Sequence, residues 1–142
     1  MNDLIKRVEE LEKDLHENLH EYPLFQEILD DIYEKRIPEI DKLLCKNEEF
    51  YIKEAINKLV KLNDYIKETS KDIDKQYKLF DKQATTWNKY TYINAEKIIV
   101  DDMNEKSRKA NKLINSHKVS DLHEANKIMH DLIYKAKYYN DK

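Results

Sequence analysis

The sequence contains no glycine, whereas average usage of about 7% would place roughly ten in a chain of 142 residues. Glycine supplies the tight turns of β-sandwiches, the close approach of backbone to pyrophosphate in dinucleotide-binding folds, and the phosphate cradle of P-loops. Its absence argues against all three. The fold class that remains is all-α, and the rest of the sequence is patterned as amphipathic helices.

Cysteine and long apolar runs are also scarce. Cys45 is the only cysteine, so the chain has no internal disulfide and no cluster of thiolate ligands for a metal. No apolar run approaches the roughly 20 residues that span a bilayer, and Met1 to Leu4 lack the charged-then-apolar layout of a signal peptide. We expect no membrane association and a cytoplasmic location.

The residues that are abundant are charged ones, at 39% of the chain. Leu, Ile, Val and Phe still number 36 of 142, above the level of roughly 20% below which chains tend to be disordered. We therefore expect one elongated helical domain over residues 1–142 with a thin core. Residues 1–50 hold 7 Lys and Arg against 15 Asp and Glu, and residues 51–142 hold 19 against 14. An acidic arm facing a mildly basic bundle fits this imbalance, and the basic excess is too small and spread out to favour a nucleic-acid partner.

Residues 1–46 form the acidic N-terminal part. Residues 2–21 are predicted to be a helix with an a/d heptad seam at Met1, Leu4, Val8, Leu11, Leu15, Asn18 and Tyr22. Pro23 suits the first turn of a second helix, whose apolar stripe is Leu24, Phe25, Ile28, Leu29 and Ile32. A residue before proline avoids the α region, so we expect a bend at Ile37-Pro38 and a short continuation through Ile40, Leu43 and Leu44.

Residues 47–88 give the clearest periodic signal, a long helix with Asn47 as its N-cap. Its seam steps by four and three residues through Ile52, Ile56, Leu59, Asn63, Ile66, Ser70, Ile73, Tyr77, Phe80, Ala84 and Trp87. This seam is the predicted interaction surface and a possible homodimer interface. Asn63 and Ser70 either fix its register or face water inside a monomeric bundle.

Residues 89–142 are predicted to end in an αα-hairpin that turns at Ser116 to Val119. Ser120 or Asp121 is the expected cap of the second helix, with Glu124 completing a capping box. One helix is lined by Ile99, Met103, Ala110, Leu113 and Ile114, the other by Leu122, Ala125, Met129, Leu132, Ile133 and Ala136. The hairpin is a possible peptide-binding site, with Met103, Leu113, Ile114, Leu122, Met129 and Leu132 as its binding residues.

One string, His16-Glu17-Asn18-Leu19-His20, has the HExxH form of zinc proteases. The heptad pattern places His16 and His20 at positions b and f, on the solvent face, whereas a catalytic zinc needs a shaped and partly dry site. We expect no metal, no cofactor and no catalytic residue. A zinc hydrolase is the remote alternative, and adventitious metal binding by the histidine pair stays open.

Three further histidines, His117, His123 and His130, form either a patch or separate positions at the edge of the core. Lys135, Lys137, Tyr138 and Tyr139 mix basic and aromatic residues, as a nucleic-acid contact or a frayed terminal helix would. The chain has ten tyrosines, which favour protein interfaces because they present a large area with a polar tip.

From Trp87 to Ile133 the order of residues resembles the C-terminal helical region of bacterial Hsp70-like (DnaK-type) chaperones. The matching residues are Trp87, Met103, Ala110, Leu113, Ile114, Leu122, Met129, Leu132 and Ile133. The chain departs from the family at Ser116, where the family's turn tends to have glycine, and at Ile133-Tyr134, where the family's helix stops. The resemblance implies a lid-like or partner-binding role without an ATP site, with protein or unfolded peptide as the partner. The alternative is an independent coiled-coil adaptor that pairs through the long helix.

Overall fold

A computed structural model describes residues 1–141, in which every regular element is helical and no strand occurs, so the predicted all-α class is confirmed. Backbone contacts divide the chain into two compact units, Met1–Lys71 (unit 1) and Asp72–Lys142 (unit 2). No helix in the described part is long and apolar enough to cross a membrane. The elements are α1 (Asn2–Glu21), α2 (Gln26–Asp31), η1 (Ile32–Arg36), α3 (Ile37–Cys45), α4 (Glu49–Asn88), α5 (Lys97–Ile114) and α6 (Val119–Asn140).

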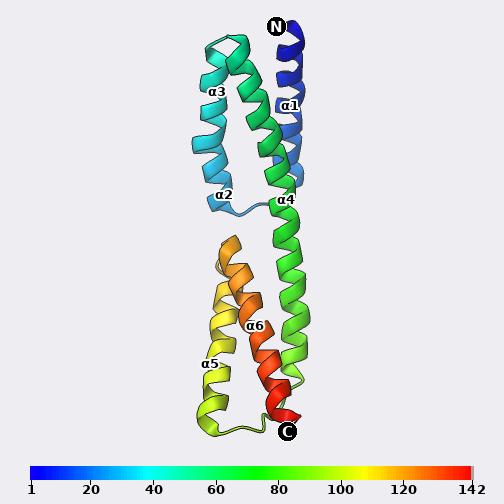
Figure 1. Ribbon diagram of the computed structural model, residues 1–142, viewed down its shortest axis with the longest axis vertical. Helices are drawn as coiled ribbons and strands as arrows, with labels where there is room; N and C mark the ends of the chain where they lie inside the picture. Colours follow the sequence, from blue (N-terminus) through cyan, green and yellow to red (C-terminus); the bar gives the residue numbers. More distant parts are fainter. Residues whose placement is uncertain (142) are drawn as a thin grey trace. The chain divides into compact units, whose positions relative to one another are not determined.

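Unit 1 packs α1 and the α2–η1–α3 segment against the first part of α4 (Figure 1). The predicted seam of α1 is confirmed at Val8, Leu11, Leu15 and Asn18, which are buried. Met1, its predicted first member, is exposed instead. A polar pair also lies inside this unit: Asn18 donates to the side-chain oxygen of Asn63 over 2.9 Å, and Asn63 donates to the carbonyl of Leu11 over 3.2 Å. The buried apolar residues are Val8, Leu11, Leu15, Ile32, Ile40, Ile52, Ala55, Leu59, Leu62 and Ile66.

The two predicted effects of proline are both different in the structure. Pro23 lies outside any helix, since α2 begins at Gln26. The first hydrogen bonds of α2 run from the backbone amides of Ile28 and Leu29 to the carbonyl of Phe25. Ile37, before Pro38, keeps α-helical angles (φ −64°, ψ −47°), and the preceding turn is a π-helix in which the Ile37 amide reaches back to the carbonyl of Ile32. Pro38 fits there because it occupies the first turn of α3, where an amide is dispensable. The continuation through Ile40 is confirmed.

Without glycine, other residues must take the left-handed conformation that ends helices. Asn47 (φ 51°) and His117 (φ 60°) do so after α3 and α5. The prediction of Asn47 as an N-cap is therefore wrong, and α4 begins only at Glu49. The predicted caps Ser120 and Asp121 are also wrong, because α6 begins at Val119, and the Ser116 hydroxyl accepts the Lys118 amide in the turn instead.

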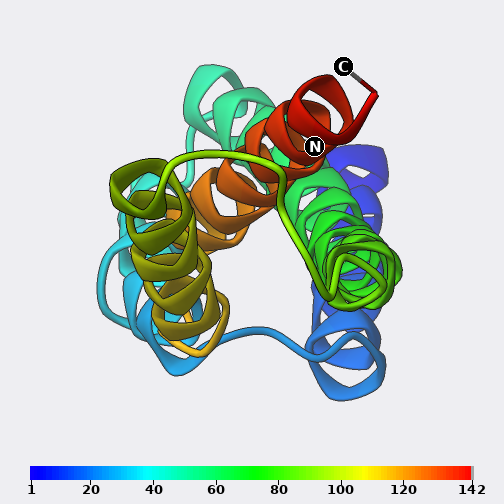
Figure 2. The ribbon, with the colours of Figure 1, turned by 90° about the horizontal axis from the view of Figure 1, so that it is seen from below.

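Unit 2 packs the α5–α6 hairpin with the last part of α4, which ends at Asn88 (Figure 2). The connector between α4 and α5 is tied to the end of α6, since Asn140 accepts the Asn94 amide over 2.9 Å and donates to the Tyr92 carbonyl over 3.0 Å. The predicted hairpin is confirmed. The buried apolar residues are Ile73, Phe80, Ile93, Met103, Ala110, Ile114, Leu122, Ala125, Met129, Leu132 and Ala136.

Candidate functional site

The predicted seam of α4 lies inside the chain's own two units. Ile52, Leu59, Asn63, Ile66, Ser70, Ile73 and Phe80 are buried, and Ile56, Tyr77, Ala84 and Trp87 are half-buried. The polar seam residue Asn63 bonds to α1 of the same chain. A partner that used this seam would first have to displace the chain's own helices.

The predicted binding residues of the hairpin are also interior. Met103, Ile114, Leu122, Met129 and Leu132 are buried, and Leu113 is half-buried. Their role in the folded chain is to hold unit 2 together. A peptide that binds the folded hairpin must therefore use other side chains.

The histidines of the HExxH string do not converge with other ligands. His16 and His20 are exposed on α1, as the heptad predicts, and Asn18 between them is buried against Asn63. Residues 1–141 contain no group of three or more His, Cys, Asp or Glu side chains that would hold a metal ion. The string has the spacing of a zinc motif but lacks a third ligand.

His123 forms a close polar contact on unit 2, with its Nε2 atom 2.6 Å from an Asp72 carboxylate oxygen. Gln76 donates to the other oxygen over 3.2 Å. Burial raises the pKa of Asp72, but the hydrogen bonds from His123 and Gln76 and the charges of His123 and Lys75 outweigh burial, so the pKa lies below its ordinary 3.8. One turn further along each helix, Asn126 donates to the Gln76 carbonyl and side chain. These contacts fasten α6 to α4 within unit 2.

The outer side of the hairpin carries a groove of about 350 Å³ between α5 and α6. Ile128, Leu132 and Tyr134 supply its apolar surface. Charges of both signs surround it, with Lys106 held by Asp102 over 3.0 Å on the α5 side. The other charged residues of the lining are Lys109, Glu124, Asp131 and Lys135.

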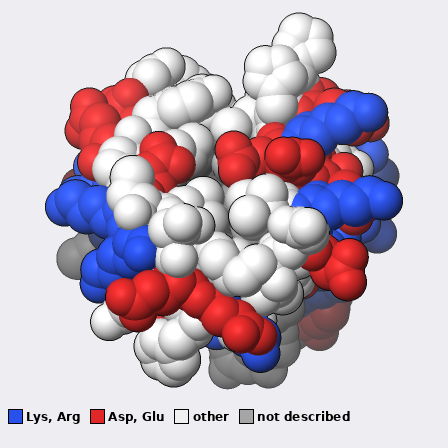
Figure 3. Space-filling model, turned by 90° about the horizontal axis from the view of Figure 1, so that it is seen from above, with Lys and Arg blue, Asp and Glu red and all other residues white. Residues whose placement is uncertain are grey.

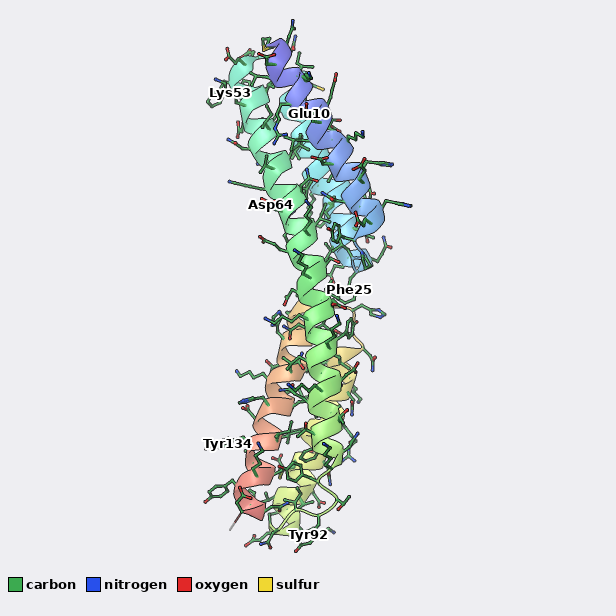
Figure 4. The ribbon with its side chains drawn as sticks, turned by 90° about the vertical axis from the view of Figure 1, so that its right-hand side faces the viewer. Glu10, Phe25, Lys53, Asp64, Tyr92 and Tyr134 are labelled. Atoms are coloured by element: carbon green, nitrogen blue, oxygen red, sulfur yellow. The ribbon has the colours of Figure 1, made fainter. Side chains whose placement is uncertain are left out.

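Tyr134 in the lining of this groove is one of several large apolar side chains that are exposed on unit 2. Tyr134 is 71% exposed on α6, and Tyr138, one turn later on the same face, is 52% exposed. Ile98 on α5 is 75% exposed, and Tyr92 in the connector is 72% exposed. Figure 4 places Tyr134 along α6 and Tyr92 at the connector end of the same unit.

Comparison with models of protein families, with curated proteins and with solved structures finds no match for this chain.

Runs of three consecutive apolar residues in the sequence are a signal for these exposed side chains. Leu132, Ile133 and Tyr134 are consecutive, as are Ile98, Ile99 and Val100. Successive residues on a helix point about 100° apart, so three in a row cannot all face one core. In each triplet one member is left outside, and these members are Tyr134 and Ile98.

Proposed function

We propose that this chain is a non-enzymatic protein-interaction module that binds apolar segments of other proteins along the outer groove of its α5–α6 hairpin. The observation that supports it best is that Tyr134, which is 71% exposed, lines a groove with an apolar strip, while Ile98 and Tyr138 are exposed on the same two helices. Exposed aromatic side chains offer large contact area at a small entropic cost, and they are enriched in protein interfaces.

The mixed charges around the groove favour a peptide over a purely apolar ligand. A bound segment can seat apolar side chains on Ile128 and Tyr134 while its polar groups meet Lys106, Asp131 and Lys135 at the rim. This division into an apolar centre and a polar rim is the usual anatomy of a protein-binding surface.

We extend the proposal to a chaperone role, as the lid-like or partner-binding region of an Hsp70-like protein. This extension rests on the resemblance of the segment from Trp87 to Ile133 to the C-terminal helical region of bacterial Hsp70-like chaperones. A chaperone region accepts many unfolded segments, whereas an adaptor selects one partner. A groove that offers apolar contacts and flexible charged side chains fits the broader choice.

The test compares surface variants in an aggregation assay. The intact chain is expected to slow the aggregation of a heat-denatured client and to bind unfolded peptides at micromolar levels without nucleotide. The double variant Ile98→Ser/Tyr134→Ser should lose most of this activity while keeping its helical circular dichroism and melting temperature. Phe50→Ser is the matched control, because Phe50 is 71% exposed but lies on unit 1.

Two outcomes would change the proposal. An intact chain that ignores unfolded clients but retains one specific partner, and loses it in the double variant, would be an adaptor. ATP turnover by the purified chain, or equal loss of client binding in Phe50→Ser and the double variant, would contradict the proposed function.

A further inference from the structure

A second groove lies on unit 1, between α1 and α3. Its floor is made of Leu15, Ile40 and Leu59, all of which are buried. The two walls run antiparallel, so the carboxyl groups of Glu12 on α1 and Asp41 on α3 meet at one end. One and two turns further along lie apolar wall residues, of which Leu19 and Tyr33 mark the other end.

No Lys or Arg lines the carboxyl end of this groove, and the basic side chain in its lining is His16 on α1. Within residues 1–141 neither Glu12 nor Asp41 takes part in an ion pair, although Lys and Arg pairs occur elsewhere on unit 1. Burial, and the neighbouring carboxylates of Asp41 and Glu9, raise the pKa of Glu12 above its ordinary 4.5. Repulsion between two acidic groups over an apolar floor is a cost that a bound cation would remove.

The aromatic end is formed by an irregular turn. Tyr33 is 56% exposed, lines the groove and belongs to the π-helical turn Ile32–Arg36. The cavity measures about 160 Å³, below the roughly 300 Å³ at which small-molecule pockets begin. It therefore suits a few side chains of a larger partner rather than a whole small ligand.

The charge of the unit agrees with a basic occupant. Unit 1 holds 12 Lys and Arg against 18 Asp and Glu, while unit 2 holds 14 against 11. Seen from the end where α3 passes into α4, uncharged residues fill the middle of the surface and charged side chains of both signs lie around them (Figure 3). Acidic surroundings raise the local concentration of a basic segment before it binds.

From this geometry we infer that the α1–α3 groove binds a basic amphipathic helix of a partner protein. One Lys or Arg of the helix lies between Glu12 and Asp41, and apolar residues one and two turns away rest on Leu15 and Leu19 beside Tyr33. Recognition of an amphipathic helix by apolar anchors at such spacings is a recurring mode of peptide binding. This site is separate from the hairpin groove and shares with the proposed function only the class of ligand.

The test titrates the full chain into a fluorescently labelled amphipathic peptide of Lys and Leu, followed by fluorescence anisotropy. Saturable binding is expected, and the double variant Glu12→Gln/Asp41→Asn should weaken it about tenfold. Tyr33→Ser should weaken it as well. Glu10→Gln is the matched control, because it also removes one carboxylate from α1 but Glu10 faces Arg7 at 3.5 Å, outside the groove (Figure 4).

Several results would overturn the inference. These are equal weakening by Glu10→Gln and by Glu12→Gln/Asp41→Asn, equally tight binding of a peptide with Glu in place of Lys, or no binding at all. A chain that sediments as a dimer, dissociates in Glu12→Gln/Asp41→Asn and ignores the peptide would assign the groove to a second copy instead.

Failure of this site and failure of the hairpin site are distinguishable. Ile98→Ser/Tyr134→Ser should bind the basic peptide normally, and Glu12→Gln/Asp41→Asn should still slow client aggregation. Circular dichroism melting of each variant checks that a loss of binding does not come from unfolding.

Discussion

Unit 1 and unit 2 each pack helices around part of α4, but they bury different kinds of side chain. The core of unit 1 is almost entirely Leu, Ile and Val, with Ala55 as its one small member. Unit 2 buries three alanines, Ala110, Ala125 and Ala136, together with Met103 and Met129. Small residues allow helices to approach closely, and methionine adapts to the space that remains. Unit 1 therefore depends on filled volume, and the hairpin of unit 2 depends on close approach.

The largest expected effect is the loss of a filled core position. Leu59→Ala and Leu122→Ala remove fully buried leucines from unit 1 and unit 2. Each should lower the free energy of unfolding by about 2 to 5 kcal/mol. Hydrogen exchange should show the loss of protection mainly in the unit that carries the substitution. Equal loss in both units would show that the cores are not separate.

A larger side chain in the core tests the other half of the comparison, the close approach of helices in unit 2. Ala125 is fully buried in the close-packed hairpin, and Ala125→Leu is expected to destabilise unit 2 by about 1 to 3 kcal/mol through overpacking. Tyr134→Leu, at an exposed position on the same helix, is the control and should change stability little. If Ala125→Leu melts at the wild-type temperature, close approach of the helices is not what holds the hairpin.

The buried polar pairs give a smaller effect that depends on the partner. Asn63→Leu leaves the amide of Asn18 buried without its acceptor and should cost about 1 to 3 kcal/mol. The double variant Asn18→Leu/Asn63→Leu should recover much of this loss, because neither amide remains. A double variant whose cost equals the sum of the two single variants would show that the pair is not coupled.

Substitution of two carboxyl groups, those of Asp72 and Glu12, should change stability least, and in opposite directions. The pKa of Asp72 is lowered, so its stabilising contribution is present above its ordinary pKa of 3.8 and is lost as pH falls through the lower folded value. The pKa of Glu12 is raised above 4.5, so its ionised form opposes folding above that raised value, and the opposition disappears on acidification.

At pH 7 Asp72→Asn should therefore lower the melting temperature slightly and Glu12→Gln should raise it slightly. Each substitution should change the free energy of unfolding by less than about 1 kcal/mol, because both groups are partly exposed. Thermal melts at pH 7 and near pH 2.5 measure this. The two differences from wild type should shrink in acid, and a difference that is the same at both pH values would contradict the electrostatic explanation.

The sequence was sufficient to predict most of the buried residues of α1, α4 and the hairpin, because apolar periodicity is a property of each helix alone. The bounds of α1, the seam of α4 and the two helices of the hairpin all follow from it. Helix ends were harder to predict. Asn47 is suited to an N-cap and also to a left-handed turn. Only the packing of α3 against α4 decides that Asn47 ends α3 rather than capping α4.

The candidate sites were predictable only in part, for a related reason. A seam predicts that a surface is covered but not what covers it, so residues such as Ile66 and Met129 were assigned to partner binding although the chain's own helices bury them. Both grooves depend on neighbours from separate elements. Glu12 and Asp41 lie 29 positions apart in the sequence, and no local pattern connects them.

The most direct test of the two proposed grooves is a pair of two-dimensional NMR titrations of the full chain, one with an unfolded apolar peptide and one with the basic amphipathic peptide. We expect the first titration to shift amide signals of α5 and α6 around Ile98 and Tyr134, and the second to shift those of α1 and α3 around Glu12 and Asp41. Shifts confined to one common set of residues, or no shifts in either titration, would contradict the claim that each unit carries its own protein-binding groove.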